Sequence, residues 1–262
     1  MGGSNMAKGY TIANENIDFD LLRKSYFSAK SFDQRFNWGD LDLIFNVVCL
    51  HPDRFPGINF QKDEVKTQEA YIQRWVKGYH NAVMNLPSTR TAGPKSSCTD
   101  PAIKTIVKET QGLSETEATN GEKAHNLFMS AENIQGNLLE EYIASVARPY
   151  GFLWCDGNVL RAIDFCNTDG SFFLQVKNKS NTENSSSSNI REGTTIKKWF
   201  RLGTRTRGGE KYPSYKWDIL NHIINDYKTE GENLPPVHTS EEDYQKFLIS
   251  KAAKNHNLIT DL

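Results

Sequence analysis

An acid, a carboxamide and a lysine come close together in segment 161–179, which reads RAIDFCNTDGSFFLQVKNK. Asp164 stands among apolar residues that favour burial, where an acid costs free energy unless a cation or hydrogen bonds compensate it. Gln175 and Lys177 follow in a second apolar run, and the turn-forming residues 167–170 between the two runs predict a hairpin. We therefore expect this hairpin to bring Asp164 close to Gln175 and Lys177.

These three residue types suit the hydrolysis of a phosphodiester bond. Because a hard divalent cation takes oxygen ligands, we expect Mg²⁺ to bind the carboxylate of Asp164 and the carboxamide of Gln175. The cation would polarise the phosphate and lower the pKa of an attacking water. Lys177 would orient or deprotonate that water, or neutralise the charge that develops on the phosphate. The structural alternative is a cross-strand ion pair between Asp164 and Lys177.

A helix and three strands are expected to position these side chains. The buried stripe of the helix falls within 136–146. A single carboxylate is a small set of charged ligands for Mg²⁺, and Glu140 on this helix is the best candidate for a second acid. In the structural alternative, Glu140 is a surface acid. Alternate residues of a strand share a face, so Gln175 and Lys177 are expected to point away from the core. The strands are predicted at 151–155, 159–166 and 171–179.

Helices are expected through much of the remaining chain, which has no internal repeats. They are predicted at 19–27, 41–50, 68–86, 136–146, 194–202, 214–227 and 240–254, with a polar helix that begins at Ser114. Loops are predicted at 87–101, 180–188 and 203–209. These elements indicate an α/β (α+β) fold. We expect a flexible leader at 1–12, a helical N-terminal region at 13–112, and the sheet with its loops at 113–262, in one compact unit with the helical region.

A basic segment interrupts an otherwise acidic chain. Residues 177–216 contain ten Lys and Arg against three Glu, whereas the whole chain has a net charge of −1. A stripe of positive charge favours a polyanionic partner such as nucleic acid. The alternative is a solvated, charged loop region.

Cysteine spacing and hydropathy argue against several classes of protein. The cysteines are widely spaced and lack the spacing of a zinc site. Cys155 and Cys166 lie in apolar runs, so we expect buried thiols in a reducing compartment. No stretch approaches the roughly 20 apolar residues of a membrane span, and the start of the chain lacks the apolar core of a signal peptide. A cytoplasmic protein is therefore expected.

The order of these elements resembles that of the PD-(D/E)xK nucleases. That superfamily has a helix with a glutamate, a strand with an aspartate, and a strand that ends in an acid-x-lysine step. Here 136–140 (GNLLE) corresponds to the helix motif, Ile163-Asp164 to the PD step, and Gln175-Val176-Lys177 to the acid-x-lysine step. The resemblance implies a mixed central sheet flanked by helices. Gln175 replaces the second acid and Ile163 the proline, which leaves the number of metal ligands open.

The resemblance is more specific over 161–202, which is similar to SinI-type restriction endonucleases that cut double-stranded DNA at GGWCC. It implies a type II restriction endonuclease of a bacterial restriction–modification system. Such an enzyme acts as a homodimer, requires Mg²⁺ and leaves 5′ overhangs, while a cognate DNA methyltransferase acts on the same site without binding the enzyme. The alternatives are a non-catalytic DNA-binding module and a repair or junction nuclease of the same fold.

The resemblance also predicts a DNA-contacting region directly after the catalytic strand. Polar side chains contact phosphates and base edges, and Arg or Lys pairs with guanine, so some of these residues would contact phosphates only. The predicted contacts are Lys179, Asn181, Asn184, Ser185, Ser186, Arg191, Lys197, Lys198, Arg201, Arg205 and Arg207. The predicted catalytic residues are Asp164, Gln175, Lys177 and Glu140.

Overall fold

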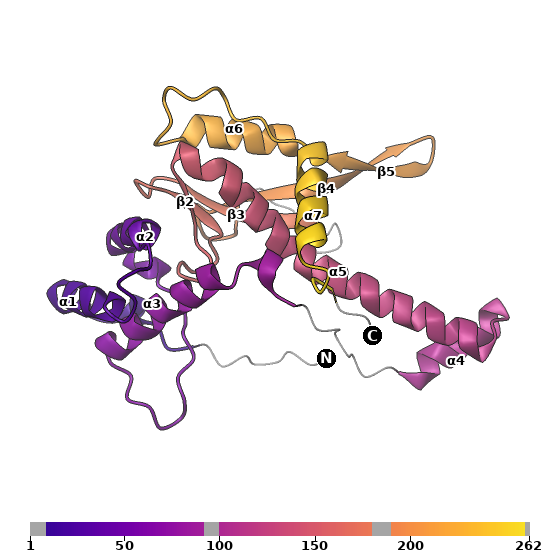
Figure 1. Cartoon of the computed structure of the whole chain (residues 1–262), viewed down its shortest axis with the longest axis horizontal. Helices are drawn as coiled ribbons and strands as arrows, with labels where there is room; N and C mark the ends of the chain where they lie inside the picture. Colours follow the sequence, from indigo (N-terminus) through magenta and orange to yellow (C-terminus); the bar gives the residue numbers. More distant parts are fainter. Residues whose placement is uncertain (1–8, 92–99, 180–189, 260–262) are drawn as a thin grey trace. The chain divides into compact units, whose positions relative to one another are not determined.

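The computed structural model describes residues 9–91, 100–179 and 190–259 (Figure 1). Contacts between Cα atoms divide the chain into two compact units. The first unit consists of Met1–Asn85 and Ile143–Ser240, and the second of Leu86–Tyr142 and Glu241–Leu262. The expected division of the chain at residues 12 and 112 stays a prediction.

A five-stranded mixed sheet, in the order β1-β2-β3-β4-β5, forms the centre of the first unit. Strands β3 and β4 are parallel, and the other neighbouring strands are antiparallel. The strands are β1 (Phe152–Trp154), β2 (Phe165–Asn167), β3 (Phe173–Lys179), β4 (Lys197–Arg207) and β5 (Glu210–Tyr215). Together with the helices, this sheet confirms the predicted mixed α/β fold.

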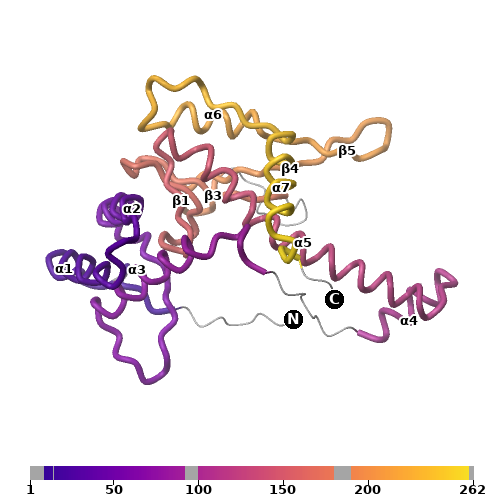
Figure 2. Tube along the Cα trace, viewed as in Figure 1, coloured from indigo at the N-terminus to yellow at the C-terminus, as the bar shows by residue number. Residues whose placement is uncertain are grey.

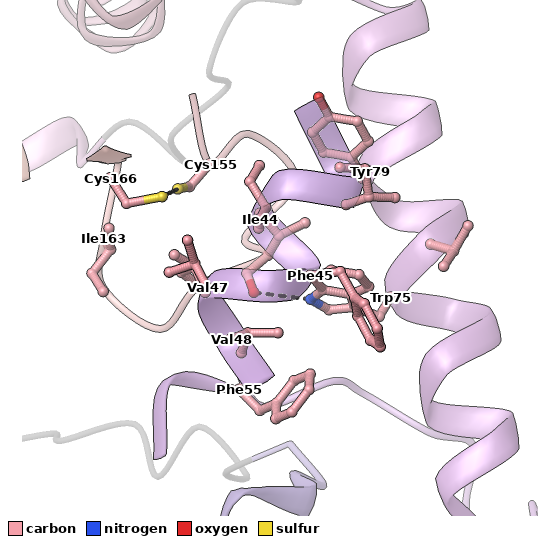
Figure 3. Close-up of a cluster of buried hydrophobic side chains, with 14 of the residues drawn as sticks. Ile44, Phe45, Val47, Val48, Phe55, Trp75, Tyr79, Cys155, Ile163 and Cys166 are labelled. Carbon is pink, nitrogen blue, oxygen red and sulfur yellow. Dashed lines mark hydrogen bonds between the residues drawn. The ribbon is translucent and has the colours of Figure 1, made fainter. Parts of the chain in front are cut away.

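Helices α1 (Phe19–Lys30), α2 (Gly39–Leu50) and α3 (Gln68–Met84) share a buried cluster with one face of the sheet. The register pairs Leu153 with Cys166, and Cys166 with Phe173, and all three residues belong to this cluster. In Figure 3, Cys155 and Cys166 lie near the α2 residues of the cluster, and their sulfur atoms are 3.8 Å apart. The predicted buried thiols are confirmed.

Helix α6 (Trp217–Tyr227) contacts β4 through a pair of tryptophans. The ring centroids of Trp199 and Trp217 are 5.2 Å apart, and Trp199 Nε1 donates to the Lys216 carbonyl at 2.9 Å. The buried stripe of α6 confirms the predicted amphipathic helix, but the predicted start at residue 214 is wrong, because residues 214 and 215 pair with β4 as part of β5 and the helix begins at Trp217. Short 3₁₀ helices complete this unit: η1 (Ile12–Asn14), η2 (Pro52–Arg54) and η4 (Arg148–Tyr150).

The predictions of a helix at 194–202 and a loop at 203–209 are wrong, because β4 spans Lys197–Arg207. The apolar residues Ile196, Trp199 and Phe200 have a spacing that is compatible with one helical turn. Parallel pairing with β3, where Gln175 lies opposite Lys198, instead holds the chain extended. A pairing partner that comes from elsewhere in the chain overrides a weak local pattern.

Two other predicted elements have different limits. The strand predicted at 159–166 is mostly a turn, in which Ala162 has a φ of 61°, and only Phe165–Asn167 pairs as β2. A left-handed conformation costs a non-glycine residue roughly 1–2 kcal/mol, so other contacts must hold this turn. The two helices predicted before the sheet are one helix, α5 (Glu115–Ala147).

The second unit contains α4 (Pro101–Gln111), most of α5, α7 (Glu241–Lys254) and the 3₁₀ helix η3 (Pro87–Thr89). Glu141 on α5 is buried, accepts hydrogen bonds from the backbone and hydroxyl of Ser88, and pairs with Lys251 of α7 at 2.7 Å. Because all these charges and donors are matched, the cluster ties three elements together. Among the described residues, no helix is both long and apolar enough to span a membrane.

Candidate active site

Asp164 directly precedes β2 and is bonded to β3 at two points. Its backbone N–H donates to the Leu174 carbonyl at 2.9 Å. Its Oδ2 atom accepts a hydrogen bond from the Val176 N–H at 2.7 Å. These two bonds fall on either side of Gln175 and hold the Asp164 carboxylate beside that residue. The hairpin thus brings the two residues together as their spacing predicts, while their chemical roles stay a prediction.

The surroundings of Asp164 have opposing effects on its pKa. Burial raises the pKa of Asp164 above its ordinary value, whereas the Val176 N–H and the positive charges of Lys177 and Arg191 lower it. Lys177 itself is exposed. Among the described residues it forms no ion pair within 4.0 Å, so the structural alternative of an Asp164–Lys177 ion pair is not observed. Lys177 is therefore free to contact a ligand at the end of β3.

Gln175 is only 7% exposed, so the prediction that it points away from the core is wrong. It shares a strand face with Phe173, and that face packs against the N-terminal helices. The Gln175 side chain forms no hydrogen bond with any described residue. A carboxamide in this state suits a ligand that supplies the missing interaction.

The oxygen atoms of Asp164 and Gln175 fit a hard divalent cation. The Oδ1 atom of Asp164 accepts no hydrogen bond from the described part of the chain, so it remains free for a ligand. In the same part of the chain, no group of three His, Cys, Asp or Glu side chains could hold a metal ion. Mg²⁺ often uses only one or two carboxylates and completes its coordination with waters and substrate phosphates. This donor set therefore suits a cation that is bound together with a phosphate.

The other predicted acid, Glu140, lies on α5 in the second compact unit and is half-buried. It has interactions of its own, so it is not a free carboxylate. The adjacent Glu141 is committed to Ser88 and Lys251. The role of Glu140 as a second acid stays a prediction.

The predicted DNA contacts occupy different environments in the first unit. Lys179, Arg191, Arg205 and Arg207 are exposed. Lys197 and Lys198 are half-buried, and their ammonium groups lie over the rings of Tyr227 and Phe200, at 5.6 and 5.9 Å from the centroids. Arg201 is 6% exposed and donates from Nε to Asn178 at 2.9 Å. Asn181, Asn184, Ser185 and Ser186 lie outside the described residues.

The outer part of β4 forms a two-stranded ribbon with β5 that sequence reasoning missed. Pairing of β3 with β4 ends at Lys179 and Leu202, whereas β4 and β5 continue to pair as far as Arg207 and Glu210. In Figures 1 and 2 this ribbon extends beyond the other strands of the sheet. The Gly208-Gly209 pair between two alternating segments was the available signal for a hairpin.

Arg205 and Arg207 lie on one face of the ribbon, because residues two apart in a strand point the same way. Tyr212 lies opposite Arg205, and Glu210 lies opposite Arg207. Neither arginine has a hydrogen bond or ion pair with another described residue. The ribbon thus presents, on the same side, two guanidinium groups that have no partner in the described part of the chain.

Comparison with known proteins places this site in a family. The chain matches the SinI restriction endonuclease family over residues 42–231, which include most of α2, the whole sheet and α6. It is 39% identical to the type II restriction enzyme Eco47I of Escherichia coli over 163 residues, 61% of this chain and 69% of the relative. It is 40% identical to the type II restriction enzyme SinI of Salmonella infantis over 145 residues, 54% of this chain and 62% of the relative.

The resemblance inferred from segment 161–202 is therefore confirmed, and it extends further towards the N-terminus than that segment. Type II restriction enzymes are site-specific deoxyribonucleases that bind double-stranded DNA and generally use a divalent metal ion. Because the family match covers well over half of its 262 residues, the chain belongs to the SinI restriction endonuclease family of type II restriction enzymes.

Proposed function

We propose that this enzyme cuts double-stranded DNA at GGWCC, requires Mg²⁺ and leaves 5′ overhangs. The observation that carries the proposal is the bonding of Asp164 to β3 on either side of Gln175, two residues before Lys177. All these residues lie in the region that matches the family, and both relatives are named type II restriction enzymes.

In this proposal Asp164 and Gln175 hold the cation and Lys177 acts on the phosphate. When bound, Mg²⁺ polarises the phosphate and lowers the pKa of the attacking water. Asp164 serves as a ligand in its ionised form, which the nearby charges of Lys177 and Arg191 favour against the effect of burial. Lys177 extends from the exposed end of β3, where its charge stabilises the phosphate in the transition state. Glu140 remains the proposed second acid.

We infer that the β4–β5 ribbon reads the DNA sequence. A two-stranded ribbon fits the major groove of B-DNA, where Arg forms two hydrogen bonds with O6 and N7 of guanine. Arg205 and Arg207 are exposed, unpaired among the described residues and directed to one side. The more buried Lys197, Lys198 and Arg201 suit phosphate contacts. Lys197 and Lys198 lie opposite Leu174 and Gln175 at the start of β4, with Arg191 close by, whereas Arg201 and Lys179 lie at the base of the ribbon.

The remaining parts of the proposal concern partners. GGWCC is nearly palindromic, so a two-fold homodimer would place one subunit on each half of the site. A cognate DNA methyltransferase would protect the same sequence without binding this chain. Both enzymes would act in the bacterial cytoplasm.

Digestion of a sequenced plasmid that contains GGWCC sites tests the proposal. We expect discrete fragments in the presence of Mg²⁺ and none in EDTA, with every mapped end at GGWCC and a 5′ overhang. Binding without cleavage would favour the non-catalytic DNA-binding module. Nicking or cutting that depends on branched DNA would favour a repair or junction nuclease of the same fold.

Arg205→Gln and Arg207→Gln are expected to relax the sequence preference. Loss of a two-bond contact with guanine costs about 1–3 kcal/mol, or roughly 5- to 150-fold in affinity for the cognate site. Competition between cognate duplexes and duplexes with single substitutions in the GG step measures the effect. Lys211→Gln is the matched control, because Lys211 is exposed on the opposite face of the ribbon. Equal discrimination in all three variants would contradict base reading by these arginines.

Gln175→Glu is expected to lower the Mg²⁺ concentration needed for cleavage. A second carboxylate beside Asp164 adds a charged ligand for the cation, and affinity for such cations rises with the number of charged ligands. Gln175→Leu, which replaces the carboxamide by an apolar group of similar size, is expected to raise the requirement. The half-saturating Mg²⁺ concentration for cleavage separates the variants. The same value in both variants and the parent enzyme would mean that Gln175 is not a ligand.

A further inference from the structure

Arg54, the last residue of η2, packs over Phe173 of β3. It therefore covers the face of β3 that also carries Gln175 and Lys177. Its guanidinium carbon is 5.6 Å from the centroid of the Phe173 ring. Its carbonyl oxygen accepts a hydrogen bond from the N–H of Arg161 at 2.8 Å, three residues before Asp164. Arg54 therefore contacts both chain segments that form the site.

The side chain of Arg54 is largely buried, and its ion pair with the exposed Asp53 leaves its Nε atom without a hydrogen bond. The side chain is only 13% exposed, and its Nε atom is buried without a hydrogen-bond partner in the described part of the chain. This nitrogen lies 3.2 Å from Asp53 Oδ2, yet the geometry does not make a hydrogen bond, and Asp53 is 61% exposed. An arginine keeps its charge and carries five N–H donors. Burial of such a group costs free energy unless an anion pairs with it.

Arg74 shows how the same chain satisfies an arginine that has a structural role. Its guanidinium carbon lies 4.6 Å from the centroid of the Phe60 ring, which resembles the stacking of Arg54 on Phe173. Unlike Arg54, it donates to the carboxylate of Glu64 and to the carbonyl of Asn59. Stacking on a ring therefore does not explain why Arg54 leaves its donors unused.

The position of Arg54 suits a phosphate bound at Asp164 and Gln175. Gln175 is the next side chain after Phe173 on the same strand face, and such neighbours are roughly 7 Å apart. A planar guanidinium forms two parallel hydrogen bonds with phosphate oxygens. These hydrogen bonds are stronger in a site from which water is excluded. A phosphate beside Gln175 is thus within the range of the unused donors of Arg54.

We propose that Arg54 binds the scissile phosphate and stabilises the charge that develops on it during cleavage, a role that rests on the proposed nuclease function. In this step a water oxygen bonds to phosphorus, and the bond between phosphorus and the leaving sugar oxygen breaks. The water loses one proton and the leaving oxygen gains one. Arg54 transfers no proton, because its guanidinium stays protonated, and it donates N–H groups to the non-bridging oxygens.

Single-turnover cleavage of a GGWCC duplex by Arg54→Ala, Arg54→Lys and Arg74→Ala tests the proposal. Removal of one donor to a transition-state oxyanion lowers the rate roughly 10²- to 10³-fold, and we expect this loss for Arg54→Ala, with a smaller loss for Arg54→Lys. We expect Arg74→Ala to cut at the rate of the parent enzyme. Added guanidinium chloride, below denaturing concentrations, should restore part of the activity of Arg54→Ala. Thermal unfolding of each variant reports any loss of stability.

The outcomes separate the role of Arg54 from the function as a whole. Guanidinium rescue that is specific to Arg54→Ala supports the role, because a lost structural contact does not respond in this way. Parental activity in Arg54→Ala, or a lower rate with a lower melting temperature and no rescue, overturns it while the nuclease function stands. A parent enzyme that cuts no duplex in Mg²⁺ overturns both proposals.

Discussion

Asp164→Asn is expected to abolish cleavage and to leave DNA binding intact. Asparagine keeps the shape of the side chain and an oxygen that can accept the Val176 N–H, so β2 and β3 remain bonded. It loses the charge that binds the cation, and with it several kcal/mol of transition-state stabilisation, which corresponds to a loss of rate on the order of 10³-fold or more. Single-turnover cleavage and a mobility-shift assay measure the two properties separately. Substantial cleavage by the variant would refute the assignment of this site.

The same substitution is expected to stabilise the metal-free protein at neutral pH. Burial raises the folded-state pKa of Asp164 above its value in the unfolded chain, so the folded state favours the protonated acid. The stability contributed by that protonated form is complete below the unfolded pKa and is lost as the pH rises through the folded pKa. At pH 8 the wild-type protein therefore carries the full cost of a buried carboxylate, and Asp164→Asn does not.

Thermal unfolding in EDTA at pH 8 and near pH 4 measures this difference. We expect Asp164→Asn to melt at a higher temperature than the wild type at pH 8, and we expect the difference to shrink near pH 4. Saturating Mg²⁺ should favour the wild type, because binding to the folded state alone adds stability. A variant that is less stable than the wild type at pH 8 in EDTA would show that Asp164 is stabilised as a carboxylate without metal.

Lys177→Ala is expected to lower the cleavage rate roughly 10²- to 10³-fold, because it removes a positive charge that acts on the transition state. Lys177 is exposed and has no hydrogen bond or ion pair with a described residue, so the free energy of unfolding should change by less than about 0.5 kcal/mol. A large effect on the rate with a small effect on stability is the signature of a catalytic side chain. Single-turnover rates at saturating enzyme and thermal unfolding provide the two measurements.

Lys24→Ala is the control for loss of one positive charge. Lys24 is an exposed lysine of α1 that forms no side-chain hydrogen bond or ion pair with another described residue. We expect it to cut at the wild-type rate. If Lys177→Ala also cuts at that rate, the acid-x-lysine resemblance does not identify a catalytic residue. If both variants lose the same small amount of activity, Lys177 contributes only general attraction for DNA.

The amphipathic helices could be predicted from the sequence because their information is local. Buried residues of α3 and α6 recur at three- and four-residue spacing, and that spacing defines one face of a helix. The hairpin was predictable for the same reason, since turn residues between two apolar runs bring Asp164 to Gln175 within a short loop. These features depend on neighbours in the sequence, and they agree with the structure.

β4 could not be predicted in the same way. Ile196, Trp199 and Phe200 fit a helical turn as well as a strand, and only the hydrogen bonds with β3 decide between them. The β4–β5 ribbon depends on that decision, because it continues β4 past the end of β3. Strand pairing joins distant parts of the chain, and no periodicity within one segment reports it.

The sequence by itself determined that an acid, a carboxamide and a lysine meet in one hairpin, and it indicated the family to which the chain belongs. Only the tertiary structure decided the environment in which they meet. The N-terminal helices bury Gln175 and bring Arg54 onto the face of β3, although Arg54 lies more than a hundred residues earlier in the chain. Burial and the approach of a distant cation arise from packing between elements, which residue spacing within one segment does not encode.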